Sequence, residues 1–381
     1  MRAQPAWQDV FAGDFELPDL GGTATLTARQ EVWRAGLADG IYGPIPAPPD
    51  EISISTHVLP GTSAKHVTIE MRVQGRTFSV DAALWCPKSD SPAPLIAGLS
   101  FMGPIGVLDG DAFPIDPDAR VYTKPELGAP RGRLDDVLRG AERHRWPVDV
   151  LTDQGFAVLI SCYGSWAPDA PEAFNQHGLR PLLGVETGAI SLWAWVIQRL
   201  VDVAHSLPEV DASRVTVAGH SRLGKAALWA AAHDTRIDTV FANNAGCGGT
   251  APARHPVGET LAQKGEAYPH WIKPQTRAHA LDQHHLMGCI APRGLYVASA
   301  DQDIWADPIG TYIALRKAAS LWPEPMDWPP AKNMWHEKTP VHHPSIGHHI
   351  RQGDHEILLE DWEHFLRFLK GSAASQANLE T

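Results

Sequence analysis

A serine stands at a predicted turn between a β-strand and an α-helix. Residues 215–218 are β-prone, Gly219 and Ser221 form a Gly-x-Ser turn, and a helix-forming run begins at Ala226. A serine on such a turn projects its Oγ at the start of the helix, where free N–H groups favour a developing oxyanion. The pattern departs from Gly-x-Ser-x-Gly, because Leu223 occupies the second glycine position. Ser221 is therefore either a nucleophile or the cap of an ordinary strand–turn–helix unit.

A serine nucleophile needs a histidine base, which a carboxylate in turn orients. In α/β-hydrolases the chain order is serine, acid, histidine. Asp301 and Asp303 follow a predicted buried strand. We favour Asp303, because a few residues of turn would aim its side chain back over the sheet edge. His355 lies in a loop before the last predicted helix and is the expected base, whereas His348 and His349 lie in a strand-like stretch and are expected to be structural.

Several histidines near the C-terminus raise the alternative of a metal site. Zinc hydrolases usually hold the ion with histidines at fixed helical spacing, backed by carboxylates. No His-Glu-x-x-His motif occurs here, and prolines interrupt the group. We therefore expect no catalytic metal and no cofactor. The histidines considered are His336, His342, His343, His348 and His349.

Composition excludes several classes of partner. The chain has 381 residues, of which 44% are hydrophobic and 20% are charged, as in globular proteins. The net charge of −12 argues against nucleic acid and anionic membranes as partners. No apolar run approaches the roughly 20 residues of a membrane span, and the N-terminus lacks the apolar core of a signal peptide. We expect a cytoplasmic protein, or a periplasmic or secreted one if a leader has been removed. The oligomeric state is open.

The order of predicted elements indicates an α/β fold. Antiparallel strands near the N-terminus precede strands that alternate with helices, which is typical of a mostly parallel central sheet with helices on both faces. We predict an N-terminal arm over residues 1–50 and one α/β-hydrolase domain over 51–370. That domain would carry an insertion at about 101–150 and a loop at about 320–345, and a disordered tail would follow over 371–381. The predicted strands are 52–59, 66–73, 77–86, 94–99, 156–162, 214–218, 238–243 and 294–300, and the predicted helices are 28–37, 190–204 and 358–369.

Six motifs in one order resemble the glucuronoyl esterases of carbohydrate esterase family 15, in their bacterial branch. The similarity runs over residues 33–369. The family consists of α/β-hydrolases that cleave esters of 4-O-methyl-glucuronic acid, such as xylan–lignin cross-links. The motifs are Gly219-His-Ser-Arg-Leu-Gly-Lys225, Asn243-Asn-Ala-Gly-Cys-Gly-Gly249, Gly258-Glu-Thr260 with Pro269-His-Trp271, Asp282-Gln-His284, Asp303-Ile-Trp-Ala-Asp-Pro308 and Arg351-Gln-Gly-Asp-His355.

The resemblance implies roles for individual residues. It makes Ser221 the nucleophile, His355 the general base and Arg222 a side-chain donor to the oxyanion. It also implies that a second group of residues holds the glucuronate sugar, namely Lys225, Glu259 and Trp305.

Many family members carry the triad glutamate where this chain has Asn244, so the acid is expected from the later strand, at Asp303. The expected substrate is a uronic-acid ester or a glucuronoxylan-derived oligosaccharide. Two alternatives remain: a general carboxylesterase or acetyl-sugar esterase with the same triad, and a non-catalytic carbohydrate-binding protein.

Overall fold

The computed structural model describes residues 16–379, apart from residues 124, 185, 256, 274–279 and 325. Side chains are described for this part of the chain except those of residue 125 and residues 373–379. The predicted N-terminal arm is therefore visible only from residue 16 onward. Its helix, predicted over 28–37, is α2 (Leu26–Leu37).

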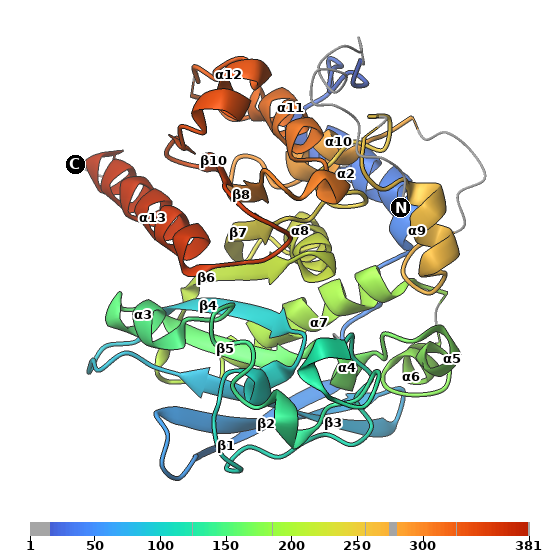
Figure 1. The fold of residues 1–381 in the computed structure, drawn as a ribbon, viewed down its shortest axis with the longest axis vertical. Coiled ribbons are helices and arrows are strands. Elements are labelled where there is room, and N and C mark those ends of the chain that lie inside the picture. The colour runs from blue at the N-terminus through green and yellow to red at the C-terminus, as the bar shows by residue number, and fades with distance from the viewer. Residues whose placement is uncertain are drawn as a thin grey trace.

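A ten-stranded sheet forms the centre of the molecule, and its order is β1-β2-β3-β5-β4-β6-β7-β8-β10-β9. Figure 1 shows it rising from β1 at the bottom towards β10. The N-terminal strands β1, β2 and β3 pair antiparallel with one another, and β3 pairs antiparallel with β5. From β5 to β10 every neighbouring pair is parallel, and β9 closes the far edge antiparallel to β10. The strands are β1 Glu51–Val58, β2 Ala64–Val73, β3 Arg76–Trp85, β4 Ala93–Ser100, β5 Ala157–Cys162, β6 Val210–His220, β7 Ile237–Asn243, β8 Gly294–Ala300, β9 Val341–His342 and β10 Ile346–Arg351.

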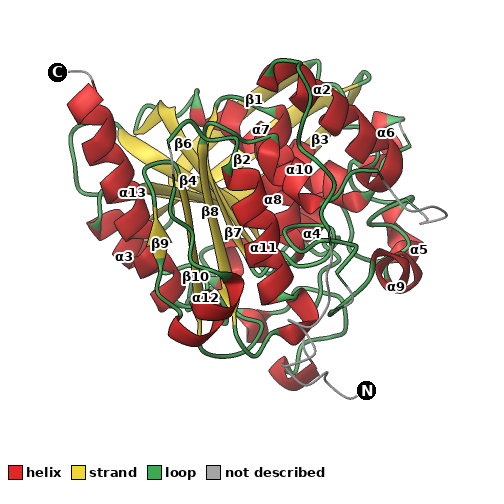
Figure 2. Cartoon of the chain, turned by 90° about the horizontal axis from the view of Figure 1, so that it is seen from above, coloured by secondary structure: helices red, strands yellow, loops and turns green. Residues whose placement is uncertain are grey.

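Helices cover both faces of this sheet, as predicted for an α/β-hydrolase. Figure 2 shows α7, α8 and α10 on one face and α3 and α13 on the other. Helix α7 is buried almost all round because it packs against β4 and β6 of the sheet and against α8 on the same face, which explains its nearly uninterrupted apolar sequence. The remaining helices are α3 Val148–Asp153, α4 Tyr163–Trp166, α5 Pro171–Phe174, α6 Arg180–Leu183, α7 Ala189–Ala204, α8 Arg222–His233, α9 Leu261–Ala267, α10 Gln283–Gly288, α11 Pro308–Ala319, α12 Ala331–Glu337 and α13 Leu359–Leu379.

Two segments differ from the sequence-based expectation. The stretch 320–345, predicted as a loop, contains helix α12 and the short strand β9. Helix α13 continues to Leu379, although we predicted disorder from residue 371. Alanine and glutamine in this last stretch are good helix formers, so the helix can extend beyond its apolar face. The division into domains itself stays a prediction, and residues 380 and 381 lie outside the described part.

The carboxyl ends of four parallel strands place the candidate residues together. Ser221 follows β6, Asn244 follows β7, Asp303 follows β8 and His355 follows β10. In open α/β sheets ligands bind at this edge, because the loops after parallel strands converge there. Residues separated by more than a hundred positions in the chain are therefore neighbours in space.

No helix within the described residues is both long and apolar enough to span a bilayer.

Candidate active site

Ser221 occupies a strained backbone position between the end of β6 and the start of α8. Its φ is 57° and its ψ is −123°, a region that residues other than glycine rarely adopt. A Cβ at Gly219 would come within 2.2 Å of the Leu223 carbonyl oxygen, and one at Gly224 within 2.9 Å of the Gly219 oxygen. The late glycine of the motif is therefore needed where the helix crosses back over Gly219. This tight turn holds the Ser221 Oγ at the helix start.

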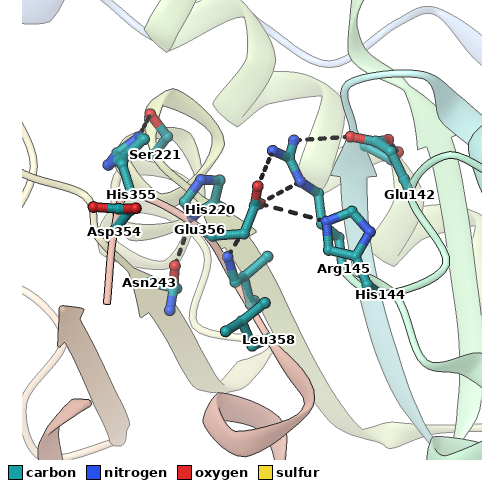
Figure 3. Close-up of polar contacts among 12 residues, drawn as sticks. Glu142, His144, Arg145, His220, Ser221, Asn243, Asp354, His355, Glu356 and Leu358 are labelled. Carbon is teal, nitrogen blue, oxygen red and sulfur yellow. Dashed lines mark hydrogen bonds and ion pairs between the residues drawn. The ribbon is translucent and has the colours of Figure 1, made fainter. Parts of the chain in front are cut away.

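The predicted serine, histidine and aspartate form one chain of hydrogen bonds. His355 Nε2 lies 2.9 Å from Ser221 Oγ, and His355 Nδ1 lies 2.5 Å from Asp303 Oδ2. Figure 3 shows the first of these contacts, with His355 reaching the serine from the loop after β10. Asp303 is buried and caps the short helical turn Ile304–Ala306, which fixes the direction of its carboxylate. The arrangement can take a proton from the serine and stabilise the resulting imidazolium.

Asp301, the alternative acid, points elsewhere. Its Oδ1 accepts a hydrogen bond of 2.9 Å from the Gly353 N–H, and its Oδ2 lies 3.1 Å from Lys338 Nζ. Asp301 thus holds the turn that carries His355 without touching the imidazole. The geometry therefore favours Asp303 over Asp301 as the orienting acid.

The three residues expected to hold the sugar line one cavity of about 440 Å³ together with Ser221. Lys225 is buried and its Nζ donates to the Ala245 carbonyl oxygen. Burial, reinforced by the nearby Lys264 ammonium, lowers the pKa of Lys225 to about 7. Trp305 is 58% exposed, so its ring is available as a wall for a ligand.

Glu259 has a partner that the sequence analysis did not identify. Its carboxylate forms an ion pair with Lys264 of α9, and both side chains line the cavity. The Lys264 ammonium also lies 4.9 Å from the centroid of the Trp271 ring, which stacks on Tyr268 at 3.9 Å. This side of the cavity therefore combines charges and aromatic faces, as sites for polyhydroxylated rings do.

Arg222 is also held by a residue that sequence reasoning missed. Its Nη1 lies 2.5 Å from Asp169 Oδ2, and both side chains are buried. Asp169 belongs to the loop after α4, where the sequence Trp-Ala-Pro-Asp carries no recognisable signal. The backbone N–H of Arg222 opens helix α8, and the first N–H groups of a helix have no intrahelical acceptor. Arg222 thus has a backbone N–H without an intrahelical acceptor directly after Ser221, and its side chain lines the same cavity.

A second group of charges connects the predicted insertion to the histidine loop (Figure 3). Arg145 Nη2 lies 2.8 Å from Glu356 Oε2, and Arg145 Nη1 lies 3.0 Å from Glu142 Oε1. Although burial raises the pKa of Glu356, hydrogen bonds from His144 and Arg145 hold it below its usual range. Because Glu356 follows His355 directly, this contact fixes the loop from the side of the insertion. The sequence offered no pattern that joins these two segments.

Comparison with known proteins identifies relatives of this chain. A family model described as fungal glucuronyl esterase matches residues 181–324. Carbohydrate esterase MZ0003, from an unknown prokaryotic organism, is 27% identical over 404 residues, covering 96% of this chain and 92% of that protein. The solved glucuronoyl esterase from Solibacter usitatus superposes with a TM-score of 0.80 at 28% identity, covering 94% of this chain and 98% of that one. This chain is a relative of the glucuronoyl esterases. The family predicted from the six motifs is thereby confirmed.

One fungal relative matches over a shorter stretch. The 4-O-methyl-glucuronoyl methylesterase 1 of Sodiomyces alcalophilus is 32% identical over 167 residues. That stretch covers 39% of this chain and only 32% of the fungal enzyme.

Asn244 stands where the glucuronoyl esterase pattern often has its triad glutamate. In this relative its Nδ2 donates to Asp303 Oδ2 over 2.8 Å. An amide at this position cannot supply the negative charge that a triad acid supplies. It can, however, hold the carboxylate of Asp303 in place. Asn244, which follows β7, thus supports the carboxylate of Asp303, which follows the neighbouring strand β8.

Among the histidines near the C-terminus, His348 and His349 are part of the core in this glucuronoyl esterase relative, whereas His336 and His342 are exposed. His349 Nε2 lies 2.9 Å from Asp361 Oδ1, and Tyr296 OH lies 2.9 Å from His349 Nδ1. His348 is fully buried, and its Nδ1 lies 2.8 Å from the Val297 oxygen. Within the part of the chain that the structure describes, no three His, Cys, Asp or Glu side chains are arranged to hold a metal ion.

Buried histidines should make the fold acid-labile. Burial lowers the pKa of His348 to about 3, whereas an unfolded histidine titrates near about 6.5. Below pH 6.5 His348 binds a proton in the unfolded chain but not in the folded chain, so the free energy of unfolding decreases as the pH falls towards 3. We expect the melting temperature of His348→Leu to fall less over this window than that of the parent, by roughly 2–4 °C. Calorimetry at a series of pH values measures the difference.

The exposed His205 provides the control. His205→Gln should leave the pH dependence of the melting temperature as in the parent. If the parent and His348→Leu lose stability in parallel between pH 6.5 and 3, the buried histidine is not the cause.

Proposed function

We propose that the chain is a serine carboxylic ester hydrolase that cleaves esters of glucuronic acid or 4-O-methyl-glucuronic acid. The observation that carries this proposal is the Ser221–His355–Asp303 hydrogen-bond chain, whose serine and histidine line the same cavity as the charged and aromatic side chains described above. The names of its relatives, carbohydrate esterase and 4-O-methyl-glucuronoyl methylesterase, support the same reaction class.

The reaction follows from the positions of these groups. His355 Nε2 removes the proton from Ser221 Oγ as that oxygen attacks the ester carbonyl carbon. The carbonyl oxygen becomes an oxyanion, which the backbone N–H and the guanidinium of Arg222 stabilise. Collapse of this intermediate expels the alcohol, which takes its proton from His355, and leaves the uronoyl group on the serine. A water molecule, deprotonated by His355, then releases the free uronic acid.

The polar side of the cavity sets the expected substrate. Lys225 lies in the first turn of α8, just beyond Ser221, and both side chains line the cavity. Lys225 can donate to ring hydroxyl groups, the Glu259 carboxylate can accept from them, and the exposed Trp305 ring can lie against the sugar. Glucuronoxylan-derived oligosaccharides carry such rings and are natural candidates. Acetyl esters leave these groups unpaired, which costs affinity for the transition state.

Substrate preference tests this proposal. We expect benzyl or methyl glucuronate to be hydrolysed with kcat/KM at least ~10²-fold above that of simple alkyl or aryl acetates. Lys225→Met, which keeps the stem and removes the ammonium, should reduce that preference by ~1–3 kcal/mol and leave acetate turnover nearly unchanged. Steady-state kinetics on both substrate types give the ratio.

An exposed lysine on α13 gives the matched control, since Lys370→Met removes a cation far from the cavity. It should leave both rates as in the parent. Equal turnover of glucuronates and acetates by the parent would instead indicate a general carboxylesterase or acetyl-sugar esterase. Absence of turnover on either, together with glucuronate binding, would indicate a carbohydrate-binding protein.

A further inference from the structure

A single buried carboxylate, that of Asp169, collects hydrogen bonds from four side chains. Arg222 Nη1 lies 2.5 Å and Tyr163 OH 2.8 Å from its Oδ2. On the other oxygen, Trp271 Nε1 lies 2.7 Å and His270 Nε2 3.0 Å from Oδ1. Two donors on each oxygen use all of the lone pairs that a carboxylate offers. Asp169 is thus rigidly held in a layer of residues behind the cavity.

The Arg222 head is enclosed by aromatic rings as well as held by Asp169. Its guanidinium carbon lies 4.4 Å from the centroid of the Trp271 ring and 4.9 Å from that of Tyr122. Phe101 and Tyr268 contribute rings at 5.5 Å each. Planar guanidinium groups stack on such faces, which restricts their rotation. The surrounding rings therefore hold the long Arg222 side chain in one arrangement.

The buried Nε–H of this enclosed guanidinium is left without an acceptor in the described part of the chain. Among the residues that the structure describes, Arg222 Nε is buried and has no hydrogen-bond partner. A buried N–H of this kind costs free energy unless a ligand accepts from it. Arg222 follows Ser221 in the chain, and both residues line the same cavity.

We propose that Asp169 is a positioning residue that holds the Arg222 guanidinium so that its Nε–H is reserved for the oxyanion. The inference rests on the proposed esterase function. Asp169 binds Nη1 of the guanidinium. Without this contact, Nη1 would be free to turn towards solvent or substrate. Donors arranged in advance stabilise an oxyanion strongly because they need no reorganisation during the reaction. Asp169 acts only through Arg222 and touches no reacting atom.

A double-mutant cycle tests this role. Asp169→Asn should lower kcat for benzyl glucuronate by ~10²-fold and change KM by less than ~3-fold, since the donor acts in the transition state. Arg222→Ala should lower kcat by roughly 10²–10³-fold. The double variant should be no slower than Arg222→Ala alone, because Asp169 has nothing left to position. Rates are expressed per active serine, counted by fluorophosphonate labelling.

Tyr163→Phe serves as a second variant if Asp169→Asn does not fold. It removes one hydrogen bond to Asp169 Oδ2, and the one that the phenol oxygen accepts from the Tyr122 N–H, and keeps the buried ring and the ion pair. We expect kcat to fall a few-fold in the parent background and not at all in the Arg222→Ala background. The matched control is Asp202→Asn, which breaks the partly buried ion pair with Arg199 away from the cavity and should keep kcat.

The outcomes separate the two proposals. A loss of kcat in Asp169→Asn or Tyr163→Phe that persists undiminished without Arg222 would overturn the positioning role. So would a change confined to KM. If Arg222→Ala keeps the parent kcat while Ser221→Ala is inactive, the positioning inference fails and the esterase function stands. Parent protein that hydrolyses no glucuronate ester would remove the proposed function itself.

Discussion

Replacing Ser221 by alanine should leave a folded protein with almost no esterase activity. Loss of a triad serine costs on the order of 10⁶ in kcat, because no other group can form the acyl-enzyme. The fold should survive, since alanine lacks only the Oγ and the strained turn is set by Gly219 and Gly224. Product release from benzyl glucuronate, together with the circular dichroism spectrum, measures both expectations.

A buried serine away from the cavity provides the control for this variant. Ser299 lies in β8, and Ser299→Ala should keep the parent rate. Retention of more than a few per cent of activity in a clean preparation of Ser221→Ala would remove Ser221 from the mechanism.

Asp303→Asn should produce the next largest loss, on the order of 10⁴ in kcat. The asparagine can present an N–H to His355 Nδ1, which stabilises the wrong tautomer and provides no charge for the imidazolium. Binding should change little, because Asp303 lies behind the histidine, on the side away from the serine. Steady-state kinetics therefore should show a lower kcat with a nearly constant KM.

Asp301→Asn is the matched control on the same turn. Its carboxylate binds the Gly353 N–H and Lys338, so its loss should loosen the loop and cost much less activity than Asp303→Asn. A reversed order of the two variants would make Asp301 the orienting acid. If neither variant matters, the acid lies elsewhere and the contact of Asn244 with Asp303 has another purpose.

Much of the fold could be predicted because its signals are local. Apolar runs bounded by turns indicated the strands from β1 to β8, and the all-round apolar sequence of α7 indicated a helix against a sheet. Helix α12 was missed because it is short and flanked by prolines, so the segment reads as a loop. The extension of α13 was missed because its last residues have helical propensity without an apolar face.

The candidate site was predictable where the motif carries the chemistry. The structure brings Ser221, His355 and Asp303 together as the strand order requires, because they follow β6, β10 and β8, parallel strands in one part of the sheet where only β7 intervenes. Asp169 could not be found, since its contact with Arg222 joins distant segments and leaves no periodic pattern. Lys264 lies close to Glu259 in the chain, but the sequence does not show that the two side chains pair in the cavity. The roles of these two charged residues become recognisable only when the structure shows which side chains they contact.

The position of a bound ester tests the account most directly. A crystal structure of Ser221→Ala with benzyl glucuronate should show the ester carbonyl carbon ~3–3.5 Å from the place of the missing Oγ, the distance of a near-attack arrangement. The carbonyl oxygen should face the Arg222 N–H groups, and the ring hydroxyls should contact Lys225 and Glu259, with Trp305 along the sugar. A sugar bound outside this cavity, or one whose carbonyl points away from position 221, would contradict the proposed function.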